Sequence, residues 1–160
     1  MDYITEASYQ VAQWDLGSIA FADIAEQLTK TYRRARRAIP ENWQMASATE
    51  LHELRRRVVE HRYQMEMIEP AWPRLGRIWV EEAQRLRNRL GEYQDLTLLA
   101  QFAAPHHPLA PWRSRLVPII ARQQASHATA AARVARRLFA EPPKAFRARL
   151  EALWQAQSGD

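Results

Sequence analysis

Apolar residues recur every three to four positions over most of this chain, which is the spacing of an amphipathic helix. Prolines interrupt the pattern and divide it into stretches of helical length. No stretch alternates apolar and polar residues as a half-buried strand does. The pattern predicts five helices: Ile19 to Ile39, a segment that begins after Ser47 or Thr49 and ends at Pro70, a segment that contains Leu75 to Tyr93, Pro111 to about Phe139, and Lys144 to Gln157.

The fold class that follows is all-α, an antiparallel helical bundle of four long helices with shorter terminal helices. We expect residues 1–18 to form an N-terminal extension, with a short helix that packs on the rest, and residues 19–157 to form the bundle. Pro118 lies inside the fourth predicted helix and predicts a kink or a restart there. Gly91 lies inside the third, where it would let another helix approach closely.

The predicted helix over residues 51–63 has three faces rather than two. One is apolar, and a second, which holds Glu53, Arg57 and Glu60, is expected to face water. The third is basic and has only Glu66 near it. Like charges at this spacing repel one another, so the arrangement costs stability unless an anion lies over it. The basic face holds His52, Arg55, Arg56 and Arg62.

The amino-acid composition excludes several kinds of functional site. The chain has no cysteine, which excludes disulfides, thiolate chemistry and cysteine-based zinc sites. Only four glycines are present, and no Gly-rich phosphate loop is visible. No apolar run is long enough to span a membrane, and no catalytic motif stands out. We therefore expect a cytoplasmic, non-catalytic protein that needs no cofactor and no metal.

The net charge of +5 rests on 23 basic residues, nearly all arginine. The planar guanidinium suits phosphate and carboxylate oxygens, although an arginine-rich composition can also reflect the genome or growth temperature. Basic faces lie on the first and third predicted helices too, and these either converge on one anion site or remain separate solvated faces. The candidate binding residues are Lys30, Arg33, Arg34, Arg37, His52, Arg55, Arg56, Arg62, Arg85 and Arg89.

Three motifs, taken together, resemble a known family. Residues 52–55 read His-Glu-Leu-Arg, and residues 90–96 read Leu-Gly-Glu-Tyr-Gln-Asp-Leu. A basic segment over residues 32–37 precedes them. These are similar to the His-x-x-Arg signature and the Leu-Gly-x-x-x-Asp-Leu element of the CHAD family, the conserved histidine α-helical domain. The resemblance covers roughly residues 20 to 155, and departs from the family at Val59 and Glu60, where Lys or Arg is usual.

The resemblance implies that the chain binds inorganic polyphosphate through a basic helical face and catalyses nothing itself. It also implies a triphosphate-tunnel enzyme as a partner and a location at polyphosphate granules. Two other functions stay open from the residues alone. One is helical nucleic-acid binding, supported by the basic charge and the aromatic content, and the other is an interaction domain for an acidic protein partner.

The family domain consists of two similar bundles, and this chain resembles the second, C-terminal one. A lone bundle would expose the surface that normally meets its partner. Either a homodimer covers that surface, or residues 1–15 fold back over it.

Individual polar residues away from the basic faces are expected to be structural. His61 and His127 lie on apolar faces and are predicted to be core residues. His106 and His107 occupy a proline loop and are predicted to be exposed. Asp95 is predicted to form a salt bridge that orients an arginine.

Overall fold

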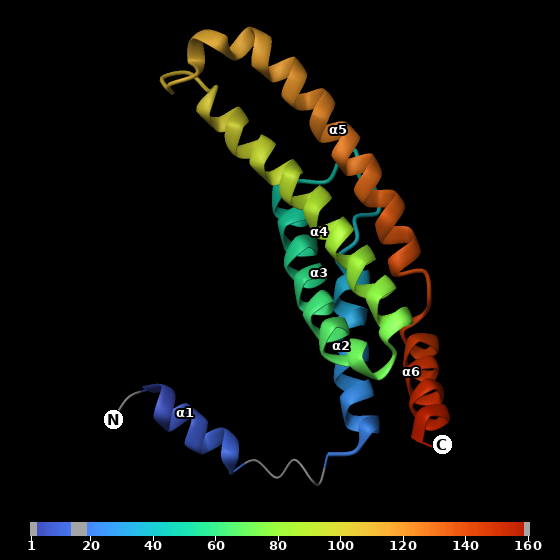
Figure 1. The fold of residues 1–160 in the computed structure, drawn as a ribbon. Helices are drawn as coiled ribbons and strands as arrows, with labels where there is room; N and C mark the ends of the chain where they lie inside the picture. Colours follow the sequence, from blue (N-terminus) through green and yellow to red (C-terminus); the bar gives the residue numbers. More distant parts are fainter. Residues whose placement is uncertain (1–2, 14–18, 159–160) are drawn as a thin grey trace.

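The computed structural model describes residues 3–13 and 19–158, and all the regular structure in them is helical (Figure 1). This confirms the predicted all-α fold. None of the described helices combines the length and apolar character that crossing a bilayer requires. The helices are α1 (Tyr3–Ala12), α2 (Phe21–Arg37), α3 (Ala48–Ile68), α4 (Pro73–Phe102), α5 (Arg113–Leu138) and α6 (Pro143–Ser158), with short 3-10 turns η2 (Glu69–Ala71) and η3 (Ala110–Trp112).

Five of these helices pack in the order α6, α2, α3, α4, α5, each against the next. The helices α4 and α5 form a long hairpin, and its tip extends beyond the ends of α2, α3 and α6 (Figure 1). The core lies where the hairpin meets the other three helices, because buried residues from all five helices form one cluster there.

A local signal in the sequence sets the start of α3, whereas the one at Pro118 does not interrupt α5. The Ser47 hydroxyl accepts a hydrogen bond from the Glu50 backbone N–H, and the Glu50 carboxylate accepts one from the Ser47 backbone N–H. This reciprocal capping box confirms Ser47 as the cap. Of the kink or restart predicted at Pro118, the restart is wrong, because α5 is continuous through this proline. A proline in the second turn removes one hydrogen bond of the helix, which the packing of the rest of α5 offsets.

The helix α1 lies apart from the bundle (Figure 1). Its described side chains, residues 5–10, are exposed, with Tyr9 63% accessible. The prediction that this short helix packs on the rest is therefore wrong for the described residues, as is the alternative in which it covers an exposed surface. A helix of ten residues gains little stability from helix propensity alone, so only packing against an apolar partner would fix its position.

Aromatic rings from α2, α3 and α6, together with Phe139 at the end of α5, pack against one another in the core. The Tyr32 and Phe146 rings stack with centroids 4.1 Å apart, and the Tyr32 hydroxyl donates to the Glu141 carbonyl oxygen. The His61 ring packs edge-on against Tyr32 and tilts against Phe139. His61 is 1% exposed, which confirms its prediction as a core residue.

Burial lowers the pKa of His61 to about 4, below the 6.5 of an unburied imidazole. The unfolded chain therefore binds a proton that the folded chain excludes, and the folded state loses stability as the pH falls below 6.5. We expect the free energy of unfolding to fall by about 2 kcal/mol between pH 7 and pH 5 from this group. Urea denaturation at the two pH values measures the change.

The matched variant is His61→Leu, which keeps the volume apolar and removes the titrating group. Most of the pH dependence between 7 and 5 should disappear in it, because carboxylates stay ionised over this range. A variant with an undiminished pH dependence would contradict this role of His61.

Candidate anion-binding faces

The basic face of α3 lies against α4 at two positions. A side-chain nitrogen of Gln94 makes a short hydrogen bond to Nδ1 of His52. Farther along α3, a Cβ atom placed on Gly91 would lie 3.5 Å from the Arg55 Nε. The two helices run antiparallel, so these contacts follow one another along the packing of α3 against α4. We call His52, Arg55 and Arg62 with Gly91 and Gln94 the α3–α4 face.

Gly91 makes room for a side chain rather than for a helix. The Arg55 guanidinium lies over the glycine, and its Nε is buried without a hydrogen-bond partner in the described part of the protein. None of the described carboxylates forms an ion pair with Arg55, in contrast to its neighbours on α3. The close approach predicted at Gly91 is thus real, but its occupant is the Arg55 side chain.

Other basic residues of α3 form ion pairs with carboxylates of the same helix. Arg56 pairs with Glu53 at 2.9 Å, and Arg62 pairs with Glu66 at 3.0 Å. Hydrogen bonding from Arg56 holds the pKa of Glu53 below its usual value. The picture of four like charges opposed only by Glu66 is therefore wrong.

The face of α3 expected to point to water is also partly covered. The Arg57 side chain is only 23% exposed, and it bridges Glu53 and Glu60 at 2.7 and 3.1 Å. Glu60, where the resemblance predicted Lys or Arg, thus neutralises Arg57 instead. This leaves Arg55 as the cation of the α3–α4 face with no carboxylate against it.

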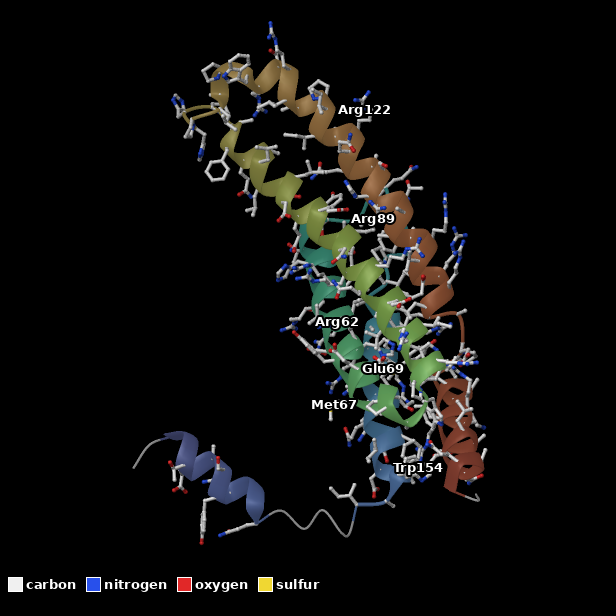
Figure 2. All side chains as sticks on the ribbon, viewed as in Figure 1. Arg62, Met67, Glu69, Arg89, Arg122 and Trp154 are labelled. Carbon is white, nitrogen blue, oxygen red and sulfur yellow. The ribbon has the colours of Figure 1, made fainter. Side chains whose placement is uncertain are left out.

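Arg85 and Arg89 lie on the other side of α4. Arg89 pairs with Glu92 at 3.3 Å, and Glu92 also lies 2.8 Å from His127 Nδ1 of α5. Figure 2 shows Arg62 on the α3 side of α4 and Arg89 between α4 and α5. His127 is therefore not a core residue, because it bridges two helices through Glu92. Arg85 is held by Glu82 at 2.8 Å.

The basic residues of α2 form a third, separate group. Lys30 and Arg33 line a hollow of about 460 Å³ together with Lys144 and Arg147 of α6. Two acidic residues reduce the charge of this hollow: Glu26 pairs with Lys30 at 2.8 Å, and Glu151 pairs with Arg147 at 2.7 Å. Arg34 and Arg37 are exposed on α2.

The structure thus distributes the ten candidate residues over several surfaces of α2, α3 and α4. Lys30 and Arg33 line the α2–α6 hollow, His52, Arg55 and Arg62 belong to the α3–α4 face, Arg89 lies at the α4–α5 junction, and Arg34, Arg37, Arg56 and Arg85 lie outside these three places. Helix periodicity predicts which residues share a face of one helix, but not which neighbouring helix packs against that face. Arg55 packs against α4 from the α3 side, whereas Arg89 lies between α4 and α5.

Comparison with known protein families shows which family the chain belongs to. Residues 10–104 match the family model described as the CHAD domain. The chain belongs to the CHAD domain family. No curated protein and no solved structure matches it. The matched part of this CHAD chain contains α2, α3 and α4, and so the whole α3–α4 face, whereas α5 and α6 lie beyond it.

Two residues of α4 differ from the prediction. Asp95 is exposed and forms no ion pair among the described residues, so it does not orient an arginine. Arg87 was not predicted, yet it lies one turn before Gly91 on the side of α4 that faces α3. Counting four residues back from Gly91 would have found it. His106 and His107 are exposed, as predicted.

Proposed function

We propose that this CHAD domain binds inorganic polyphosphate, without catalysis, on the α3–α4 face. The observation that carries the proposal is Arg55, whose guanidinium lies over Gly91 and has no carboxylate partner among the described residues. An arginine without an acid beside it keeps its donors available for phosphate oxygens, and partial burial between two helices limits the conformational entropy that it loses on binding. Membership of the CHAD family, which is associated with polyphosphate binding, supports the same ligand.

The neighbours of Arg55 extend the face along a linear ligand. His52 and Arg62 lie on the same side of α3, and Arg87 lies opposite them on α4. Polyphosphate carries about one negative charge per phosphate, so spaced donors hold it without any recognition of bases. A triphosphate-tunnel enzyme partner and a location at polyphosphate granules belong to the same proposal.

Arg55→Ala should weaken polyphosphate binding by about tenfold or more, because a hydrogen bond to a charged group contributes about 1.5–3 kcal/mol. Arg62→Ala should weaken it less, since Glu66 already holds that guanidinium. Titration calorimetry with polyphosphate at constant salt measures both, and circular dichroism checks that helicity is kept.

Gly91→Ala is the matched control for these variants. Its new Cβ would stand in ordinary contact with Arg55, 3.5 Å from Nε, so binding should persist. Gly91→Leu should displace the guanidinium and behave like Arg55→Ala. Normal binding by both Arg55→Ala and Gly91→Leu would place the ligand elsewhere on the chain.

Nucleic-acid binding is the main alternative, and competition separates the two. Binding of single strands without sequence preference uses exposed aromatic rings as stacking platforms. Tyr63 is exposed beside this face, but the Arg62 guanidinium lies 4.2 Å from the centre of its ring. Long-chain polyphosphate should therefore displace single-stranded nucleic acid at far lower concentration than the reverse. If the natural ligand were instead an acidic protein, neither polyphosphate nor nucleic acid would displace it at that concentration.

We also propose a homodimer, for which the hairpin tip gives support. Phe102 and Trp112 are each more than half exposed there, and Leu98 adds to the apolar surface. A twofold interface would use the same patch on both copies. Sedimentation at micromolar concentration should give a mass twice 18.7 kDa. A single monomeric species, unchanged by added polyphosphate, would contradict the dimer.

A further inference from the structure

The positive charge of the chain is concentrated in one helix. The sequence has 23 basic and 18 acidic residues, and α5 contributes six arginines to the former and nothing to the latter. The rest of the chain therefore holds 17 basic against 18 acidic residues and carries a formal charge of −1. The net positive charge of the chain therefore comes from α5, and this helix adds to the attraction of a polyanion long enough to reach it.

The arginines of α5 from Arg122 onward are also not neutralised by neighbours. Arg122, Arg133, Arg136 and Arg137 are exposed, and none of them pairs with a carboxylate in the described part of the chain. Arg56 and Arg85, by contrast, each pair with a carboxylate three residues away on their own helix. The absence of Asp and Glu in α5 leaves its arginines no such partner at i,i+3 or i,i+4.

These side chains lie on the outer side of α5. The buried residues Ile120, Ala128 and Ala131 face α4, and Figure 2 shows Arg122 on the side of α5 away from α4. Between the arginines lies an open hollow of about 500 Å³ lined by Arg122, Ala125, Ser126, Thr129, Ala130 and Arg133. Arg122 and Arg133 are 11 residues apart, or about 16 Å along a helix.

The chemistry of this hollow fits a linear polyanion. Its floor is small side chains with two hydroxyl groups, which allow a chain to lie close to the helix and offer it donors. Protein interfaces rely on buried aromatic and aliphatic anchors, and the outer face from Arg122 to Arg137 carries no side chain of that size. Strand-binding proteins need stacking rings, which this stretch also lacks.

We infer that the outer face of α5, from Arg122 to Arg137, is a second polyphosphate-binding track. It rests on the proposed function and extends it to a surface that lies beyond the matched CHAD region and on the opposite side of α4 from Arg55. A ligand long enough to occupy this track gains contacts that a short one cannot make, so the track makes binding depend on chain length.

The test compares two double variants of the full chain that remove the same charge. Arg122→Ala with Arg133→Ala removes the track, and Arg74→Ala with Arg77→Ala removes two exposed arginines from the start of α4. With long-chain polyphosphate the track variant should bind about a hundredfold more weakly than wild type, at roughly tenfold for each charged contact. Its slope of log affinity against log salt should be smaller by about 1.4.

With tripolyphosphate the track variant should bind like wild type, so the preference for long chains is lost in this variant alone. Equal affinities of the two double variants for long chains would overturn the track and leave the α3–α4 proposal standing. If wild type fails to bind polyphosphate of any length, the proposed function itself is overturned.

Discussion

Raising the salt concentration fourfold should weaken polyphosphate binding by about a hundredfold, for on the order of five contacts at about −0.7 in slope per neutralised phosphate. The physical reason is that exposed guanidinium groups supply the affinity, and binding releases the counterions that surround the ligand. Arg122 and Arg133 on α5 are the exposed sources, and the partly buried Arg55 of the α3–α4 face adds to them. Affinity measured by fluorescence anisotropy across a salt series gives the slope.

The control for this prediction is to check that the same change of salt concentration leaves the fold intact. Circular dichroism over the same series should be unchanged, because the core is apolar and its stability does not depend on screened charges. An affinity that barely responds to salt would mean that the arginine faces do not hold the ligand.

Phe146→Ala should lower the free energy of unfolding by about 3–5 kcal/mol, the usual cost of removing a buried phenyl ring. Phe146 is 2% exposed, stacks on Tyr32 and also contacts the His61 ring. This ring attaches α6 to the rest of the bundle, so its loss leaves a cavity among rings that have little freedom to collapse. Urea denaturation at pH 7 measures the change.

Lys144→Ala is the matched control, since it lies one half-turn away on the exposed side of α6. A surface substitution of this kind usually changes stability by less than about 0.5 kcal/mol. If the two variants were equally stable, α6 would not be part of the cooperative core. The comparison therefore tests the packing of α6 independently of any ligand.

The helices themselves could be predicted because the sequence signals that specify a helix and its ends are local. The 3.6-residue period, the Ser47 and Glu50 pair and the proline breaks each act within one helix or at its end. Pro118 was the exception: a proline strongly suggests a break, yet tertiary packing carried α5 through it. His61 was assigned correctly to the core for the same local reason, since it lies in register with Leu54 and Val58.

The binding faces could be predicted only in part. Which residues share a helix face follows from spacing, and so Arg55 and Arg62 were grouped correctly. Ion pairing depends on rotamers and on neighbouring helices, and so the pairing of Arg56 with Glu53 and of His127 with Glu92 was missed. The arginines of α5 were visible in the sequence, but their exposure and lack of partners were not.

The amino-acid sequence by itself determined that this protein is helical, that it is basic, and that it carries the CHAD motifs at residues 52–55 and 90–96. Those properties reside in single residues and in their spacing. The tertiary structure alone decided that α4 separates Arg55 from Arg89, that Gly91 receives an arginine, and that the unpaired charge faces outward on α5. Each of these depends on which helices become neighbours, and that is fixed by the packing of the whole core.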